Sequence, residues 1–492
     1  MTSPVSPRLD RYAGLVIDGE TALRSPSGGL IVDRDPANGE VLAEVASAAI
    51  ADVQRAIDAA RRAQPAWARL APGRRGGLLL ELARLIRERA DELTRVECLD
   101  TGKPLGQARA DVEVAAQYFE FYGGYADKLY GETIPLGGDD FGVTFREPMG
   151  VTGHIIPWNY PIQIGSRTLA PSLMAGNACV VKPAEEAPLS AVALGLIALE
   201  AGIPPGVLNV VPGDGEVAGA YLSSSDGIDH ISFTGGLDTG RLVMGAAARN
   251  VKPVTLELGG KSASIVLDGA DLDRAAEVLT RAIVQNAGQT CSAGSRIIAH
   301  AAIHDELVAR LEDCFKRVSI GHGLDDPDMG PLISDVQRRR VLTYLGIAED
   351  EGGVLVTGGG DDQRLGGHEA GHFLAPALLT GVAPTMRVAR EEIFGPVLCV
   401  LRARDDAEAL RIAEDSPFGL VASVWSADVD RAFRLARNLH VGQVYVNSYG
   451  AAGNVTLPFG GTRHSGFGRE KGLEAVHEYT QVKTIAVHVS PE

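Results

Sequence analysis

Short apolar runs alternate with stretches of helical character between residues 151 and 257. The runs read VTGHII, ACVVK, VLNVV, HISFT and VTLEL. Strands buried on both faces have near-continuous apolar sequences, and their alternation with helices is typical of parallel sheets. We therefore expect a doubly wound parallel α/β sheet in this region.

The same alternation of apolar runs and helical stretches begins again after GGKS at residues 259–262. ASIVL precedes a helical stretch over 271–288, and SRIIAH precedes a second one from Asp305 to Arg317. Upstream, leucine, isoleucine and valine recur at helical spacing through 78–96 and predict an amphipathic helix there. The pattern indicates a second α/β domain that begins near residue 260.

Two strand-like segments lie outside both regions of alternating strands and helices. Residues 128–148 and 477–489 alternate apolar and polar positions, which is typical of strands with one solvated face. They can pair with each other as a separate arm, and an exposed strand edge invites a second subunit.

Size and charge narrow the class of protein. A chain of 492 residues exceeds one ordinary core, because single cores stop growing near ~250–300 residues. The net charge is −17 and no basic cluster stands out, so nucleic acid and anionic membranes are poor partners. The N-terminus has no apolar signal region, and no run of about 18 apolar residues occurs. We expect a soluble, cytoplasmic protein.

The five cysteines are widely scattered and form no CxxC pair. With no histidines at metal-ligand spacing, neither a disulfide framework nor a metal site is indicated. One of them, Cys291, lies in the small-residue stretch NAGQTCSAGSR, between a predicted helix and a predicted strand. Free cysteines are mostly buried, but a loop at a domain junction is where functional groups concentrate.

A nucleophilic thiol needs oxyanion donors and a base for later hydrolysis. Asn159 follows a predicted strand in IIPWNYP, and its amide is a neutral double donor. Glu257 ends another strand in LELGG, where burial can raise its pKa toward neutrality. Both lie at carboxyl ends of parallel strands, where open α/β sheets bind ligands.

Several motifs resemble those of the aldehyde dehydrogenase superfamily, and they occur in family order. They are PWNYP, KPAEEAP, FTGGLDTG, LELGGKS, GQTCSAGSR, EEIFGPV and PFGGTRHSGFGRE. The resemblance implies that Cys291 attacks an aldehyde, Asn159 stabilises the oxyanion, and Glu257 activates water to hydrolyse the thioester. It also implies a small-molecule aldehyde as substrate and a free carboxylic acid as product.

The resemblance also implies an NAD site. Lys182 and Glu185 match the pair that binds the adenosine ribose, and a carboxylate there repels the extra phosphate of NADP, so NAD is favoured and NADP is the less favoured cofactor. Glu392 and Phe394 match residues that hold the nicotinamide ribose and ring. Gly236 replaces a serine common in relatives, for which Trp158 compensates. The other implied cofactor residues are Ile155, Pro157, Gly215, Thr234, Gly235, Gly240 and Leu258.

For the substrate, the resemblance implies a tunnel near Tyr160, Arg167 and Gln285. Arg167 matches an arginine of some semialdehyde dehydrogenases and favours an anionic substrate over a quaternary ammonium. Aromatic and aliphatic aldehydes stay open, since Gln285 stands where some enzymes for succinate semialdehyde have a second arginine. Arg167 can also bind a protein carboxylate instead.

In domain terms we expect two Rossmann-like domains and a small β arm. The NAD-binding domain comprises 1–127 and 149–259, the catalytic domain 260–460, and the oligomerisation arm 128–148 and 470–492. Relatives pair such arms across subunits, so a homodimer or homotetramer is expected. Two alternatives stay open: a CoA-acylating semialdehyde dehydrogenase, whose known examples lack the glutamate at Glu257, and a non-catalytic structural member of the family.

Overall fold

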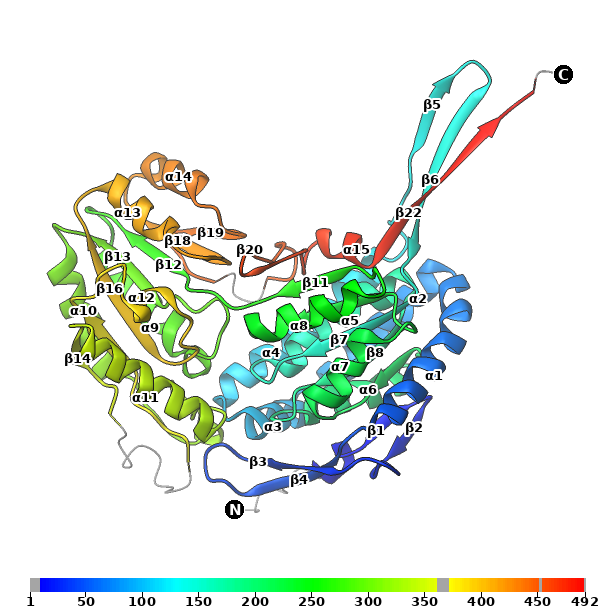
Figure 1. Cartoon of the computed structure of the whole chain (residues 1–492), viewed down its shortest axis with the longest axis horizontal. Helices are drawn as coiled ribbons and strands as arrows, with labels where there is room; N and C mark the ends of the chain where they lie inside the picture. The colour runs from blue at the N-terminus through cyan, green and yellow to red at the C-terminus, as the bar shows by residue number, and fades with distance from the viewer. Residues whose placement is uncertain (1–8, 361–370, 451–453, 491–492) are drawn as a thin grey trace.

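The computed structural model describes residues 9–360, 371–450 and 454–490. Two bodies, each built on one large sheet, lie side by side, and a narrow β arm projects from one of them (Figure 1). Both large sheets are mostly parallel and carry helices, so the predicted α/β class is confirmed. Within the described ranges, no helix is both long and apolar enough to cross a membrane.

The sheet of the first body has the order β2-β1-β9-β8-β7-β10-β11-β21. The five central strands, β9, β8, β7, β10 and β11, are parallel to one another. The edge strands β1, β2 and β21 pair antiparallel with their neighbours. Chain order reverses between β7 and β10, which makes the gap beyond their carboxyl ends the expected ligand site. The strands are β1 (Leu15–Ile17), β2 (Glu20–Ala22), β7 (Val151–Ile156), β8 (Ala178–Pro183), β9 (Leu208–Val210), β10 (His230–Thr234), β11 (Val254–Glu257) and β21 (Gly466–Phe467).

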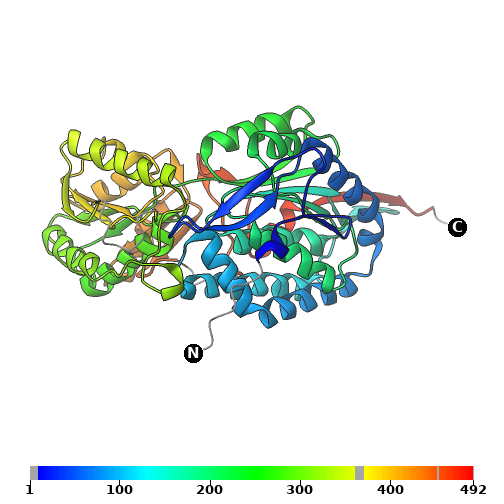
Figure 2. The ribbon, with the colours of Figure 1, turned by 90° about the horizontal axis from the view of Figure 1, so that it is seen from below.

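Helices cover both faces of this sheet, as the view in Figure 2 also indicates. One face carries α2 (Pro72–Glu88), α3 (Ala90–Thr101), α4 (Leu105–Tyr125), α5 (Pro161–Ala175) and α6 (Leu189–Glu200). The other carries α1 (Ile50–Arg69), α7 (Ala220–Ser224) and α8 (Leu237–Ala248). The single helix expected over 78–96 is wrong, because the chain breaks at Arg89. Asp91 and Glu92 then fall in the first turn of α3, where acidic side chains are favourable.

The second sheet has the order β14-β15-β16-β13-β12-β18-β19, parallel except for β14. Its strands are β12 (Ala263–Val266), β13 (Arg296–His300), β14 (Val354–Thr357), β15 (Ala377–Thr380), β16 (Val397–Ala403), β18 (Val421–Trp425) and β19 (Gln443–Val446). Its helices are α9 (Leu272–Val284), α10 (His304–Lys316), α11 (Asp335–Asp350), α12 (Arg387–Arg390), α13 (Asp406–Glu414) and α14 (Val429–Asn438). The helix expected over 271–288 ends earlier, at Val284, because the following residues take left-handed backbone angles.

The arm is a three-stranded antiparallel sheet in the order β22-β6-β5. It joins β5 (Thr133–Gly137) and β6 (Asp140–Pro148) to the distant β22 (Thr480–His488), which follows α15 (Glu474–Glu478). Two small sheets pair β3 (Leu30–Arg34) with β4 (Val41–Ala46), and β17 (Phe418–Gly419) with β20 (Thr462–Arg463). The short helical turns are η1 (Leu9–Tyr12), η2 (Gly215–Gly219), η3 (Gln285–Gly288) and η4 (Gly323–Asp325).

The two bodies meet edge to edge. Only residues 258–262 separate the end of β11 from the start of β12. The chain therefore leaves the carboxyl edge of the first sheet and enters the amino edge of the second. Side chains that follow β7, β10 and β11 face side chains that precede β13 and β16, and this junction holds the site.

Candidate active site

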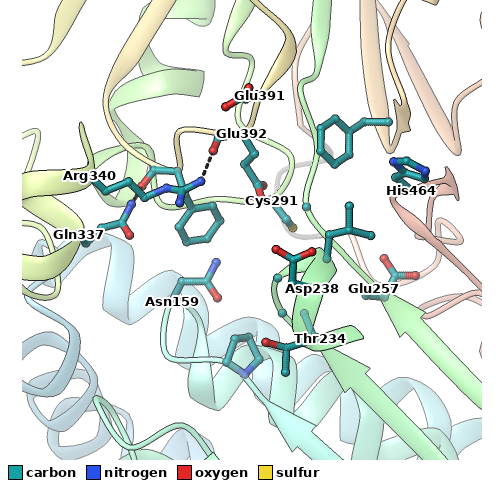
Figure 3. Close-up of a pocket in the computed structure, with 18 of the residues that line it drawn as sticks. Asn159, Thr234, Asp238, Glu257, Cys291, Gln337, Arg340, Glu391, Glu392 and His464 are labelled. Carbon is teal, nitrogen blue, oxygen red and sulfur yellow. Dashed lines mark hydrogen bonds between the residues drawn. The ribbon is translucent and has the colours of Figure 1, made fainter. Parts of the chain in front are cut away.

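A pocket of about 690 Å³ lies at this junction, between the two sheets. It brings together ten of the residues singled out from the sequence, and Figure 3 shows the arrangement around Cys291. These ten are Pro157, Trp158, Asn159, Thr234, Gly235, Gly236, Glu257, Cys291, Glu392 and Phe394. They come from five separate chain segments, so the pocket exists only in the folded chain.

Cys291 stands at the wall of this pocket on a tightly constrained loop. Asn286, Ala287 and Gly288 all have left-handed φ angles, of 49°, 52° and 72°. A Cβ on Gly288 would lie 2.3 Å from the main-chain carbon of Gly395, so only glycine lets the loop approach so closely. Burial raises the pKa of the half-buried Cys291 thiol to about 11, and the nearby Arg167 opposes this. The resting thiol is therefore protonated at neutral pH.

Asn159 is held from both sides in the turn after β7. Its main-chain carbonyl oxygen accepts hydrogen bonds from Lys103 Nζ at 3.0 Å and from Asn286 Nδ2 at 2.9 Å. Its own Nδ2 donates to the carbonyl of Gln289 at 2.8 Å. An amide nitrogen has two hydrogens, and the second is available to an oxygen in the pocket.

Glu257 ends β11 with its carboxyl group inside the pocket wall. The residue is 2% exposed, and neither carboxyl oxygen has a hydrogen-bond partner within the described part of the chain. Burial, then repulsion from Glu470, raises its pKa well above the ordinary range. A buried carboxyl without a partner is costly and rare unless it has a task, and here it is available to a water molecule or a reacting group.

The floor of the pocket suits an anionic ligand. Gly236 precedes α8 and gives it no side-chain cap, and residues 237–239 of its first turn line the pocket. The amide groups of such a turn have no partner inside the helix and attract phosphate. Thr234 Oγ1 is buried with no described partner, and space around Gly236 is open.

Aromatic and acidic side chains line another part of the pocket. The rings of Trp158 and Phe394 meet edge to face, with centroids 5.4 Å apart. Glu392 Oε1 accepts a hydrogen bond from the Gly260 amide at 3.0 Å, and burial raises its pKa to about 7. Phe394 has a left-handed φ of 61°, which indicates a strained loop at this wall.

The other cofactor candidates lie outside this pocket. At the carboxyl end of β8, Lys182 Nζ donates to Glu185 at 2.7 Å, and Glu185 accepts from the Gly215 amide at 2.5 Å. Gly240 serves packing, since a Cβ there would lie 2.6 Å from the Leu258 side chain. Ile155 is half-buried in β7.

Sequence reasoning missed two polar residues on α11 that shape the site. Arg340 donates to the carbonyl oxygens of Glu392 and Ile393 at 2.6 and 3.1 Å, the first of which is dashed in Figure 3. Gln337 donates to the carbonyl of Phe394 at 2.6 Å. These residues position the loop that contains Glu392. They lie more than fifty residues before it, and no motif marks them.

The three substrate candidates are dispersed. Arg167 is 3% exposed and forms an ion pair with Glu470, and its guanidinium lies 5.2 Å from the centre of the Phe459 ring. Tyr160 is buried, and its hydroxyl bonds Thr290 Oγ1 at 2.7 Å. Gln285 lies outside the main pocket, on the wall of a second cavity. Arg167 thus already has the protein carboxylate partner foreseen as its alternative.

Comparisons with known proteins agree with the motifs. Betaine aldehyde dehydrogenase 1 of Rhizobium meliloti (strain 1021) is 43% identical over 98% of this chain and 99% of its own. Retinal dehydrogenase 2 of Homo sapiens is 41% identical over 98% of this chain and 93% of its own. The crystal structure of betaine aldehyde dehydrogenase from Staphylococcus aureus in complex with NAD+ has a TM-score of 0.94 at 36% identity, covering 98% of this chain and 96% of that one. A model of the aldehyde dehydrogenase family matches residues 24–485, and the chain belongs to this family.

Proposed function

We propose that the protein oxidises an aldehyde to the carboxylic acid with NAD, consuming one water and releasing one proton for each NADH formed. The observation that carries this proposal is the meeting of Cys291, Asn159 and Glu257 at one pocket between the sheets. A thiol, a neutral amide donor and a buried carboxyl without a partner are the groups that acyl transfer through a thioester needs.

Each residue has one task in this proposal. The Cys291 sulfur attacks the aldehyde carbon, and its proton passes to water. The second hydrogen of Asn159 Nδ2 and the Cys291 amide stabilise the oxygen of the resulting thiohemiacetal. NAD, when bound, supplies the acceptor for the hydride, which leaves a thioester on Cys291. Glu257 then takes a proton from water, and the hydroxide releases the acid.

The residues present fit NAD. The first turn of α8 and the open space at Gly236 suit a pyrophosphate, and Glu392 and Phe394 line the same pocket. Lys182 and Glu185, fixed against Gly215, suit the adenosine ribose. The carboxylate at Glu185 disfavours a further phosphate on this ribose.

Cofactor choice provides a prediction for Glu185. The wild type should use NAD better than NADP by ten- to a hundredfold in kcat/KM, which is ~1.4–2.7 kcal/mol. Glu185→Ser should narrow this gap, because it removes the charge that repels the phosphate. Equal use of both cofactors by the wild type would argue against this role.

The assay that tests the function measures NADH absorbance and acid product together. Purified protein with NAD and a panel of aliphatic, aromatic and carboxylate-bearing aldehydes should give equal amounts of NADH and acid. Added CoA should leave the rate and the product unchanged, since Glu257 serves hydrolysis. An acyl-CoA product would favour the CoA-acylating alternative, and the absence of NADH with every aldehyde would overturn the proposal.

We also propose that the arm mediates a homodimer or a tetramer of dimers. Its strands expose Ile134, Leu136, Phe141, Phe145, Val482 and Ile485, of which Phe141, Phe145 and Ile485 share one face by the strand register. Such an apolar surface on a sheet with unpaired edges is typical of a subunit contact. Light scattering at micromolar concentration should give a multiple of the 51.7 kDa chain mass.

A variant in the arm tests where the subunits meet. Phe145→Glu should lower the mass, because it places a charge in the apolar surface, whereas Val336→Glu on exposed α11 should not. A monomeric wild type, or an arm variant that keeps the full mass, would contradict this assembly.

A further inference from the structure

Cys291 has two different surroundings. On one side lies the main pocket, with the first turn of α8 and Glu392, which suits the cofactor. On the other side the cysteine packs against an apolar and aromatic cluster of Leu420, Val421, Tyr445, Tyr449 and Phe459. When a cofactor fills the first side, an aldehyde has to reach the sulfur from the second.

Two cations lie against the Phe459 ring on this second side. The Arg167 guanidinium is 5.2 Å and the Lys471 ammonium 5.1 Å from the ring centre. Arg167 is neutralised by its buried partner Glu470. Lys471 forms neither an ion pair nor a side-chain hydrogen bond with any residue that the structure describes. The unpaired positive charge near the nucleophile is therefore Lys471, not Arg167.

The backbone holds Lys471 in place. Phe459 and Glu470 exchange two main-chain hydrogen bonds of 2.6 and 2.7 Å, so the next residue starts beside the Phe459 ring. Lys471 has a left-handed φ of 62°, which is uncommon for a residue with a side chain. Strain of this kind persists where the fold imposes it and is frequent at functional sites. The side chain is half-buried, so its ammonium is only partly solvated.

Charged groups of the site shift the pKa of the Lys471 ammonium. Burial, reinforced by Arg167, lowers the pKa of Lys471 to about 8, while Cys291, Glu470 and Glu257 act in the opposite direction. The nucleophile and the base are thus within electrostatic range of the lysine. An ammonium that is partly desolvated and lacks a partner gains free energy from binding an anion.

A second cavity beside Cys291 is lined by positively charged side chains, like the surroundings of Lys471. It has a volume of about 260 Å³ and is lined by Thr290 and Ser292, the two neighbours of Cys291, and by Arg274 and Arg281 of α9. None of the described residues that line it is acidic, although the whole chain has a net charge of −17. This cavity next to Cys291 therefore favours anions, although the protein as a whole is negatively charged.

We propose that Lys471 binds the distal carboxylate of an anionic aldehyde and so selects this substrate class. This inference rests on the proposed aldehyde oxidation and names its substrate class. The same ammonium repels a quaternary ammonium aldehyde. Substrate charge therefore separates this protein from its relatives named betaine aldehyde dehydrogenases.

The test compares succinate semialdehyde with butanal, which has the same chain length without the carboxylate. The measured quantity is the ratio of their kcat/KM values. The wild type should favour succinate semialdehyde, and Lys471→Met should lower the ratio by about ten- to a hundredfold, mainly through KM for the anion. Lys471→Arg should retain it, because a guanidinium also binds carboxylate. Lys316→Met, which removes an exposed lysine on α10, should leave it unchanged.

The pH dependence gives a readout that a structural role would not produce. Lys471 is charged below its pKa of about 8 and neutral above it, so the ratio should fall as pH rises through this value. The Arg167, Glu470, Cys291 and Glu257 groups that face Lys471 are all retained in Lys471→Arg, so this variant separates their effect on the ratio from that of Lys471. In Lys471→Arg the ratio should stay flat, since the guanidinium keeps its charge.

The outcomes separate the two proposals. A wild type that oxidises butanal as well as or better than succinate semialdehyde, or a ratio that Lys471→Met leaves unchanged, overturns the role of Lys471 while aldehyde oxidation stands. A wild type that oxidises neither of these nor any aldehyde of the panel overturns the oxidation itself.

Discussion

Cys291→Ala should lower aldehyde oxidation by about 10⁴-fold or more, because Cys291 is the one thiol among the described residues that line the pocket. The loop around Cys291 is held by main-chain geometry at residues 286–288, so loss of one sulfur should leave its shape intact. NAD binding should therefore persist, with a Kd within about twofold of wild type, since its residues lie on other elements. Stopped-flow absorbance and fluorescence titration measure the two quantities.

A second cysteine provides the matched control for this substitution. Cys314 is also half-buried and forms no disulfide, but it lies on α10, outside the main pocket. Cys314→Ala should keep wild-type turnover and show that loss of a thiol is not harmful in itself. Even a tenth of wild-type turnover in Cys291→Ala would exclude the cysteine as nucleophile.

The strands of the first sheet could be predicted because their burial is encoded locally. VTGHII, ACVVK and HISFT are short runs rich in apolar and β-branched residues, and they form β7, β8 and β10, between which the strand order reverses at the expected ligand site. Asn159 and Glu257 could be placed for the same reason, as polar residues at strand ends. Local pattern is thus sufficient wherever a side chain directly follows a buried strand.

Contacts between distant segments could not be predicted in this way. Glu470 lies about three hundred residues after Arg167, and only the folded chain brings its carboxylate to the guanidinium. This pairing neutralises the positive charge from which the sequence predicts an anionic substrate. The sequence predicts no role for Lys471. The spacing of apolar residues indicates neither its left-handed backbone angle nor the absence of an ion-pair partner among the described residues. Gln337 and Arg340 were missed for the same reason, as their acceptors are main-chain oxygens.

The base at Glu257 should be separable from the nucleophile by kinetics. Glu257→Gln keeps the size of the side chain but cannot accept a proton from water, so hydrolysis of the thioester should slow by about 10²–10⁴-fold. Hydride transfer precedes this step and should persist. Rapid mixing should then show a burst of NADH close to one per active site, followed by a slow steady rate.

The acyl enzyme and the pH profile make this prediction specific to Glu257. Mass spectrometry of the quenched variant should show the acyl group on Cys291. In the wild type, burial and Glu470 raise the pKa of Glu257, so the carboxyl is protonated at low pH and inactive as a base. Hydrolysis should therefore accelerate as pH rises through that raised pKa, and Glu257→Gln should lose this rise. Glu478→Gln is the control. The Glu478 carboxyl, on α15, accepts a hydrogen bond from Thr255, which lies in β11 with Glu257, and this variant should behave as wild type. If the burst disappears in Glu257→Gln and no adduct forms, the carboxyl acts earlier, as the base that removes the proton from Cys291.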